Sequence, residues 1–146
     1  MTQIRRVRLS DCDGIAALAK CTGAANTDFK ERVLKLMRSN CPDFGQARGR
    51  YYSLSNGGVY LSWVDYRSLV RFDHRPTGFR GQLSPDELSQ VINLRAFSDL
   101  CFVKYDDTTY QGLARAHLAL GDYIRSSASA ERLQPFIDSL LSVFGD

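Results

Sequence analysis

The sequence predicts an α+β fold, in which an antiparallel sheet of about five strands carries helices on one side. Residues 51–64 alternate apolar and polar around an Asn-Gly pair, which is typical of a β-hairpin. Ser84-Pro85-Asp86-Glu87 has the composition of a helix start. Residues 131–144 repeat apolar side chains at helical spacing. The expected order is α-β-β-β-α-β-β-α, preceded by an N-terminal helical extension.

The N-terminal part predicts a short strand and two helices. Residues 4–9 alternate apolar and charged side chains, which favours a strand. Ser10 can cap a helix over residues 10–20. A second helix is expected from about residue 26, with Asp28 and Glu31 as a capping box, and it should end before Pro42.

The middle of the chain predicts three strands. Tyr51–Ser55 and Val59–Val64 flank Asn56-Gly57-Gly58, a sequence that suits a tight hairpin turn. The region is rich in Tyr, Val, Phe and Trp, as strands prefer. A third strand is expected over Ser68–Asp73, and residues 74–83 are expected to form a loop.

The second half predicts a helix, two strands and a closing helix. Ser84 caps the first helix, which should end near residues 97–99. Leu100–Tyr105 and Tyr110–Ile124 are expected as strands because apolar residues alternate in the second of them. The closing helix is expected over Glu131–Phe144.

Composition indicates a folded protein with no strong charge bias. The chain has 146 residues, of which 44% are hydrophobic and 24% charged, and its net charge is +3. These values exclude a disordered tail or a low-complexity linker. The 15 arginines and 4 lysines leave the chain less basic than a typical nucleic-acid-binding domain.

The N-terminus does not resemble a secretion signal. Arg5, Arg6 and Arg8 interrupt the apolar residues, so no apolar run of the required length exists. No stretch of the sequence is apolar enough to cross a membrane. We therefore expect a cytoplasmic protein without a membrane partner.

The sequence contains no recognisable catalytic or metal-binding motif. The four cysteines, Cys12, Cys21, Cys41 and Cys101, are too widely spaced for a zinc knuckle. Neither a nucleophile elbow nor a phosphate-binding glycine loop occurs. The Asp73-His74 pair could serve acid–base chemistry, but only one other histidine exists, which favours a solvated loop. We expect no catalytic residue, no metal and no cofactor.

Arginines and tyrosines gather around the predicted three-strand region. Aromatic and basic side chains on a sheet are what single-stranded nucleic acids contact. No RNA-recognition signature accompanies them, so nucleic-acid binding is the third and weakest hypothesis. The arginines are Arg48, Arg50, Arg67, Arg71, Arg75 and Arg80.

Residues 4–20, IRRVRLSDCDGIAALAK, resemble the start of GNAT-type acetyltransferases, a short strand followed by a Ser/Asp-capped helix. That resemblance implies an acetyl-CoA-dependent enzyme. The nearest match to the family's pyrophosphate-binding motif is residues 75–81, RPTGFRG, which lacks the second closely spaced glycine. A divergent acetyltransferase is thus the alternative hypothesis.

Residues 27–146 resemble the YbjN-like family, whose fold is shared with type III secretion chaperones. The resemblance rests on the order of elements and on residues 91–95, 101–105 and 131–144. It implies a bacterial, non-catalytic domain over residues 27–146, with residues 1–26 as an extension.

The leading hypothesis is therefore a chaperone-like or regulatory module that binds another protein or a second copy of itself. One sheet face would be covered by helices, and the other could hold the partner. The alternative is that its side chains close the core, since large aromatic residues are usually buried. The candidate residues are Tyr60, Trp63, Val64, Tyr66 and Leu113.

Overall fold

The computed structural model describes residues 3–41, 48–64, 70–74, 79–127, 130–131 and 133–134. Within them the helices and strands follow an α+β order, which confirms the expected fold class. The elements are β1 (Arg6–Leu9), α1 (Asp11–Thr22), the 3-10 turn η1 (Gly23–Ala25), α2 (Asn26–Asn40), β2 (Arg48–Leu54), β3 (Val59–Val64), β4 (Val70–His74), β5 (Phe79–Leu83), α3 (Pro85–Leu100) and α4 (Asp107–Ser126).

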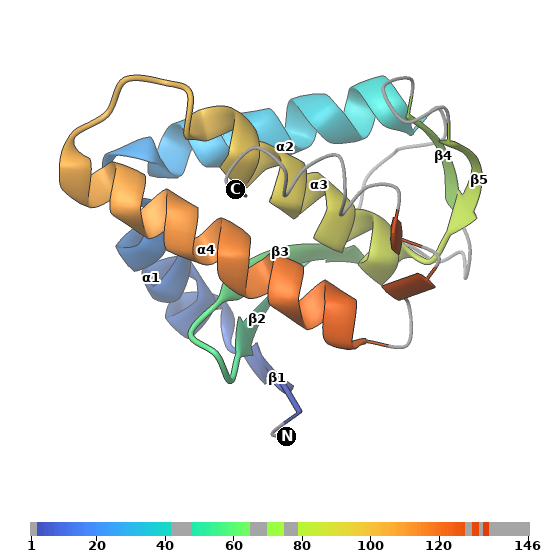
Figure 1. Cartoon of the computed structure of the whole chain (residues 1–146), viewed down its shortest axis with the longest axis horizontal. Coiled ribbons are helices and arrows are strands. Elements are labelled where there is room, and N and C mark those ends of the chain that lie inside the picture. The colour runs from blue at the N-terminus through green and yellow to red at the C-terminus, as the bar shows by residue number, and fades with distance from the viewer. Residues whose placement is uncertain are drawn as a thin grey trace.

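The described strands form two antiparallel sheets rather than one sheet of five. β1, β2 and β3 make a three-stranded sheet in that order, and β4 pairs only with β5. Figure 1 shows the β4–β5 hairpin at the opposite end of the molecule from α1. The helix α3 runs through the middle, packed against α2, α4 and β3.

The N-terminal strand and helix form as the sequence predicts. The Ser10 side chain accepts a hydrogen bond from the backbone N–H of Asp13, which caps α1. Gly23 ends the helix with φ at 52°, in the left-handed region that suits glycine. β1 pairs with β2, and Leu18 and Ala25 are fully buried, so this segment packs into the same core as the rest.

The start of α2 differs from the prediction. The helix begins at Asn26 directly after the 3-10 turn, and no side chain caps it. Asp28, expected as part of a capping box, instead accepts a hydrogen bond from the hydroxyl of Tyr105. A continuous helical connection removes the need for a side-chain cap at this point.

The hairpin of β2 and β3 confirms the strand prediction around Asn56-Gly57. Tyr51 lies opposite Leu61 and Tyr52 opposite Tyr60. Gly57 has φ at 92°, a conformation that residues with a side chain rarely adopt. The loop expected over residues 74–83 is wrong in part, because Phe79–Leu83 pairs with Val70–His74 as β5.

The helix α3 carries the predicted capping box at its start. The Ser84 hydroxyl accepts from the N–H of Glu87, and the Glu87 carboxylate accepts from the N–H of Ser84. Buried residues occur on every side of α3, as expected of a helix in the centre of a domain. The ring of Phe97 stacks on Phe29 of α2 with centroids 4.5 Å apart.

The two strands expected over Leu100–Tyr105 and Tyr110–Ile124 are wrong. The first is the end of α3 and a turn, and the second is part of the helix α4. The alternation of alanine and leucine fits a strand, but the same segment also has helical spacing. Its buried side chains include Leu113, Ala116, Leu120 and Ile124, which form one stripe along the helix.

Of the closing helix, residues 130, 131, 133 and 134 are helical, and Leu133 is fully buried. The rest of its predicted range lies outside the described residues. No described helix is long and apolar enough to span a membrane.

Candidate functional site

Two side-chain environments near the three-stranded sheet of β1, β2 and β3 differ in character. One is a polar cluster around Asp86, at the start of α3. The other is a largely apolar groove between α1, α4 and the tip of the β2–β3 hairpin.

The polar cluster joins β1, β3 and α3 through the carboxylate of Asp86. Arg6 donates to Oδ2 of Asp86 at 2.6 Å and to the hydroxyl of Tyr60 at 2.7 Å. Tyr60 and Ser62 each donate to Oδ1 of Asp86 at 3.0 Å. Gln90 donates to Oδ2 at 2.8 Å. The carboxylate therefore has partners on both oxygens and is already occupied by the protein itself.

Aromatic rings cover this cluster. The guanidinium carbon of Arg6 lies 4.3 Å from the ring centroid of Tyr52, a cation–π geometry. Tyr52 stacks on Tyr60 with centroids 5.4 Å apart. Burial, together with the Asp86 carboxylate, raises the pKa of Tyr60 above its usual range. Tyr60 therefore stays protonated at neutral pH and acts as a hydrogen-bond donor rather than as a base.

The outer edge of β3 is closed by a side chain from α3. The carbonyl oxygen of the Asn93 amide accepts from the N–H of Leu61 at 3.0 Å, and the amide nitrogen donates to the Leu61 carbonyl at 2.8 Å. The same nitrogen donates to the Ser89 carbonyl at 2.7 Å. Asn93 thus imitates a neighbouring strand and satisfies a strand edge that would otherwise be unpaired.

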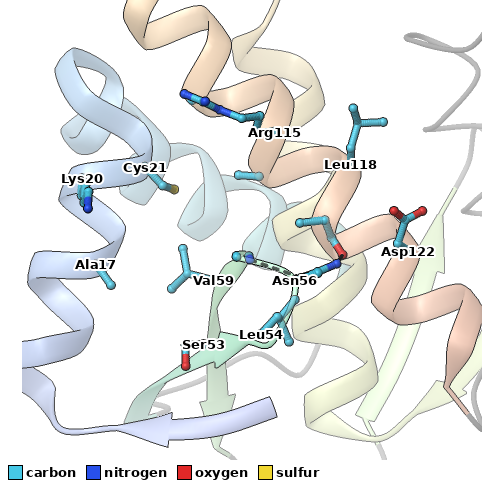
Figure 2. Close-up of a pocket in the computed structure, with 15 residues that line it drawn as sticks. Ala17, Lys20, Cys21, Ser53, Leu54, Asn56, Val59, Arg115, Leu118 and Asp122 are labelled. Atoms are coloured by element: carbon cyan, nitrogen blue, oxygen red, sulfur yellow. Dashed lines mark hydrogen bonds between the residues drawn. The ribbon is translucent and has the colours of Figure 1, made fainter. Parts of the chain in front are cut away.

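The groove has two helical walls and a hairpin floor. Figure 2 shows α1 on one side, α4 on the other and the turn between β2 and β3 lying between them. Its volume is about 700 Å³. Its apolar lining includes Ala17, Leu54, Val59, Ala116 and Leu118.

Two contacts fix the shape of the groove. Asn56 at the hairpin tip donates to the carbonyl of Ala119 at 2.9 Å, which ties the floor to α4. The walls meet at Gly112, where an added Cβ would lie 2.3 Å from the carbonyl oxygen of Cys21. Glycine is therefore required for α1 and α4 to come this close.

Charged side chains stand at the rim of the groove. Lys20 of α1 and Arg115 of α4 are exposed, and neither forms an ion pair within the part of the chain that the structure describes. Figure 2 shows Arg115 extending from α4 toward α1. Asp122 lies on the same wall about 10 Å further along α4 and pairs with Arg125 at 3.6 Å.

The groove contains a cysteine with little nucleophilic character. Burial raises the pKa of the Cys21 thiol to about 12. The reactive thiolate is therefore scarce at neutral pH. No group of three or more His, Cys, Asp or Glu that could hold a metal ion occurs among the described residues. The Cys21 thiol is thus not activated as a nucleophile.

Two of the five residues that the sequence suggested for a partner-binding sheet face are buried in the structure. Tyr60 is fully buried because its hydroxyl reaches Arg6 and Asp86 inside the polar cluster. Leu113 is fully buried because it belongs to the inner stripe of α4. The side chains of Trp63 and Val64, and the whole of Tyr66, lie outside the described residues.

The other candidate residues are placed only in part. Asp73 and His74 lie at the end of β4, opposite Arg80 and Phe79 of β5, and their side chains are outside the described residues. Arg67 and the glycine-containing segment 75–78 are also outside them.

Comparison with known proteins places this α+β arrangement in an existing structural group. The chain matches a solved structure with a TM-score of 0.82, over 94% of this chain and 99% of that chain, at 23% sequence identity. That structure comes from work on the KlcA and ArdB proteins, described as having a novel fold and antirestriction activity against Type I DNA restriction systems in vivo but not in vitro. At this identity the likeness establishes the fold.

A sequence comparison points to the same group. The chain is 35% identical over 68 residues to the antirestriction protein KlcA of Escherichia coli. The match covers 47% of this chain and 47% of that protein, so it spans about half the length of each. No protein-family model matches the chain.

These findings overturn the resemblance to YbjN-like proteins and type III secretion chaperones. The chain shares its fold with a structure described as novel, and the sequence match is to an antirestriction protein. The resemblance depended on two strands over residues 100–124, where the structure has a turn and α4. The resemblance of residues 4–20 to the start of acetyltransferases likewise reflects only a strand followed by a capped helix, and it does not place the chain in that family.

The sequence alone did not reveal the groove. Its residues come from three separate segments, and each looks ordinary in isolation: alanines on α1, an Asn-Gly turn and small residues on α4. The available signal was the pair Gly112 and Ala116 within a helical stripe, which marks a face that a neighbouring helix can approach closely.

Proposed function

We propose that this protein counteracts Type I DNA restriction systems by binding a protein component of the restriction machinery, without catalysing a reaction. The main support for the proposal is that this chain has the same fold as the solved structure from the KlcA and ArdB work, over nearly the whole length of both chains. The sequence match to KlcA supports it.

The chemistry of the described residues favours binding over catalysis. The polar cluster is engaged in internal hydrogen bonds, and burial keeps the Tyr60 hydroxyl protonated. The thiol of Cys21 is held in its unreactive form in the same way. Neither environment presents an activated nucleophile beside a base, which enzymes of the hydrolase type require.

The charge of the chain favours a protein contact over imitation of DNA. A protein that competed with DNA for an enzyme would present a negatively charged surface in place of the phosphates. This chain has a net charge of +3, and the free charges at its groove are cations. We therefore place the proposed action on a protein surface rather than on a DNA-binding channel.

The proposal is tested by phage restriction in living cells. Unmodified phage is plated on a host with an active Type I system, with and without expression of the protein. We expect expression to raise the plating efficiency by at least an order of magnitude. The same host carrying a Type II system in place of the Type I system is the control, and its restriction should be unchanged.

Two outcomes contradict the proposal. Unchanged plating on the Type I host, with soluble protein verified in the same cells, would remove the antirestriction function. Equal relief on both hosts would indicate a general effect on phage or cell rather than an action on Type I systems.

A further inference from the structure

The groove between α1 and α4 combines three features that are independent of one another. It is a largely apolar depression of about 700 Å³. Its walls are held at close approach by Gly112, and its floor is held by the bond from Asn56 to Ala119. Its rim carries an exposed leucine, Leu118, which is 49% accessible. A fixed apolar surface of this kind is typical of docking sites for other molecules.

The charges at the rim define the chemistry of the molecule that would dock. Lys20 and Arg115 come from opposite walls, and Figure 2 shows both at the same end of the groove. Neither forms an ion pair within the described residues, whereas Asp122 on the α4 wall is paired with Arg125. The unbalanced charge of the groove is therefore positive, and it favours an occupant with carboxylates beside an apolar surface.

We infer that this groove binds an apolar segment of the restriction machinery that carries acidic residues at one flank. The inference rests on the proposed function and names the surface and the partner chemistry that it uses. Small side chains on both walls let a partner backbone approach closely, and the apolar floor contacts its small or branched side chains. Lys20 and Arg115 then pair with the partner's carboxylates and set its direction in the groove.

A second copy of the chain is a poor occupant on the same grounds. The acidic residue that a second copy would offer from its own groove is Asp122, which already pairs with Arg125 at 3.6 Å. A second copy therefore brings no free carboxylate from this groove to Lys20 and Arg115. The groove therefore selects a different, acidic partner.

The first experiment compares two variants of equal charge in the phage assay. In the groove variant, Lys20→Glu with Arg115→Glu, both rim cations are reversed. In the control variant, Arg38→Glu with Lys104→Glu, two exposed cations outside the groove are reversed. Lys20 and Arg38 each lie in the last turn of a helix, so the local cost is matched. We expect the groove variant to lose most of its relief of restriction and the control to keep it.

The second experiment tests the groove without reference to restriction. The isotope-labelled protein is titrated with a designed amphipathic peptide that has alanine and leucine on one face and glutamate on its flanks. A twin peptide carries lysine at the glutamate positions. We expect the acidic peptide to shift the amide resonances of residues 17–21 and 112–119 and the basic twin to leave them unchanged. The groove variant should reverse this preference.

The outcomes separate the two proposals. If the groove variant relieves restriction as well as the wild type does, the proposed role of the groove is wrong and the antirestriction function stands. If neither the wild type nor a variant relieves restriction, the proposed antirestriction function is wrong. The peptide titration then tests by itself whether the groove binds an acidic, apolar segment. An equal response to both peptides, or no response to the acidic one, contradicts the proposed binding of an acidic segment in the groove. Sedimentation of the wild type as a dimer that the groove variant separates would also overturn it, in favour of a second copy.

Discussion

Charged side chains have different surroundings in the polar cluster at Asp86 and in the groove at Lys20 and Arg115. The Asp86 carboxylate accepts hydrogen bonds from side chains that include Arg6 and Gln90, and the cluster links β1, β3 and α3. At the groove the cations lie over an apolar surface and have no ion pair within the described part of the chain. The first arrangement is expected to contribute to stability, and the second leaves charge available to a partner.

This contrast predicts that substitutions near Asp86 and α3 change stability, whereas charge reversals at the groove change function. The following four variants test it, beginning with the one expected to have the largest effect on the free energy of unfolding.

Asn93→Ala should have the largest effect. It removes the side chain that satisfies both the N–H and the carbonyl of Leu61, and it leaves two buried backbone groups without partners. Each such group costs about 1–3 kcal/mol, so we expect a loss of about 3 kcal/mol or more. Urea unfolding followed by circular dichroism measures it. Asn40→Ala, which removes a single bond to Leu36 at a helix end, is the control; equal losses would show that Asn93 does not close the edge of β3.

Asp86→Ala should have the next largest effect. The substitution removes the acceptor shared by Arg6, Tyr60 and Ser62, and Tyr60 is fully buried. Because Asp86 is about one third exposed, solvent compensates in part. We expect a loss of about 2–3 kcal/mol in the same unfolding experiment.

The exposed residue Glu31 offers a matched control for Asp86, since it is an acidic residue on a helix surface. Glu31→Ala should change stability by less than about 0.5 kcal/mol. A loss at Asp86 no greater than that at Glu31 would contradict the structural role of the cluster.

Gly112→Ala should have an intermediate effect and should also widen the groove. Its Cβ would meet the backbone of α1 at Cys21, which has to move away. Such overpacking costs about 1–3 kcal/mol. Gly57→Ala serves as the comparison because its Cβ meets nothing within 4 Å and its cost comes from φ alone. An unchanged free energy of unfolding in Gly112→Ala would show that the walls are not held together at this point.

The reversal of Lys20 and Arg115 should have the smallest effect on stability, below about 0.5 kcal/mol for each exposed charge. Thermal melting of the groove variant and of its charge-matched control should therefore give similar midpoints. A large loss of stability in the groove variant alone would place its cations in the folding of the protein rather than in binding.

The thiol of Cys21 gives a further test of how deeply this side chain is buried in the groove wall. Its pKa is raised to about 12 by burial, so at pH 9 only about one thiol in a thousand is ionised. A thiol pKa raised on folding stabilises the native state below the unfolded value of 9.0, and this contribution is lost as the pH rises toward 12. Mass spectrometry after alkylation at pH 8 should show slow labelling of Cys21 and fast labelling of the exposed Cys12. Equal rates would contradict the burial of the Cys21 thiol.

Local signals in the sequence predicted the elements whose ends are set by their own residues. Ser10 caps α1, Ser84 and Glu87 form the box that starts α3, and Asn56-Gly57 turns the hairpin. These features depend on neighbours within a few residues, so the sequence contains all that is needed to recognise them.

Features set by distant contacts could not be predicted in the same way. In α4 the residues from Ala114 to Leu120 fit both a period of two and a helical stripe, and packing against α1 and α3 decides for the helix. Tyr60 was expected on an open face, but it is buried, and its hydroxyl bonds to Arg6 of β1 and Asp86 of α3. The groove depends in the same way on three segments that only the fold brings together.

The proposed antirestriction function is tested most directly by the plating efficiency of unmodified phage on a host with an active Type I system, with and without the wild-type protein. We predict a rise of at least an order of magnitude on expression, absent from the host with a Type II system. An unchanged efficiency, with the folded protein present in the cells, would contradict it.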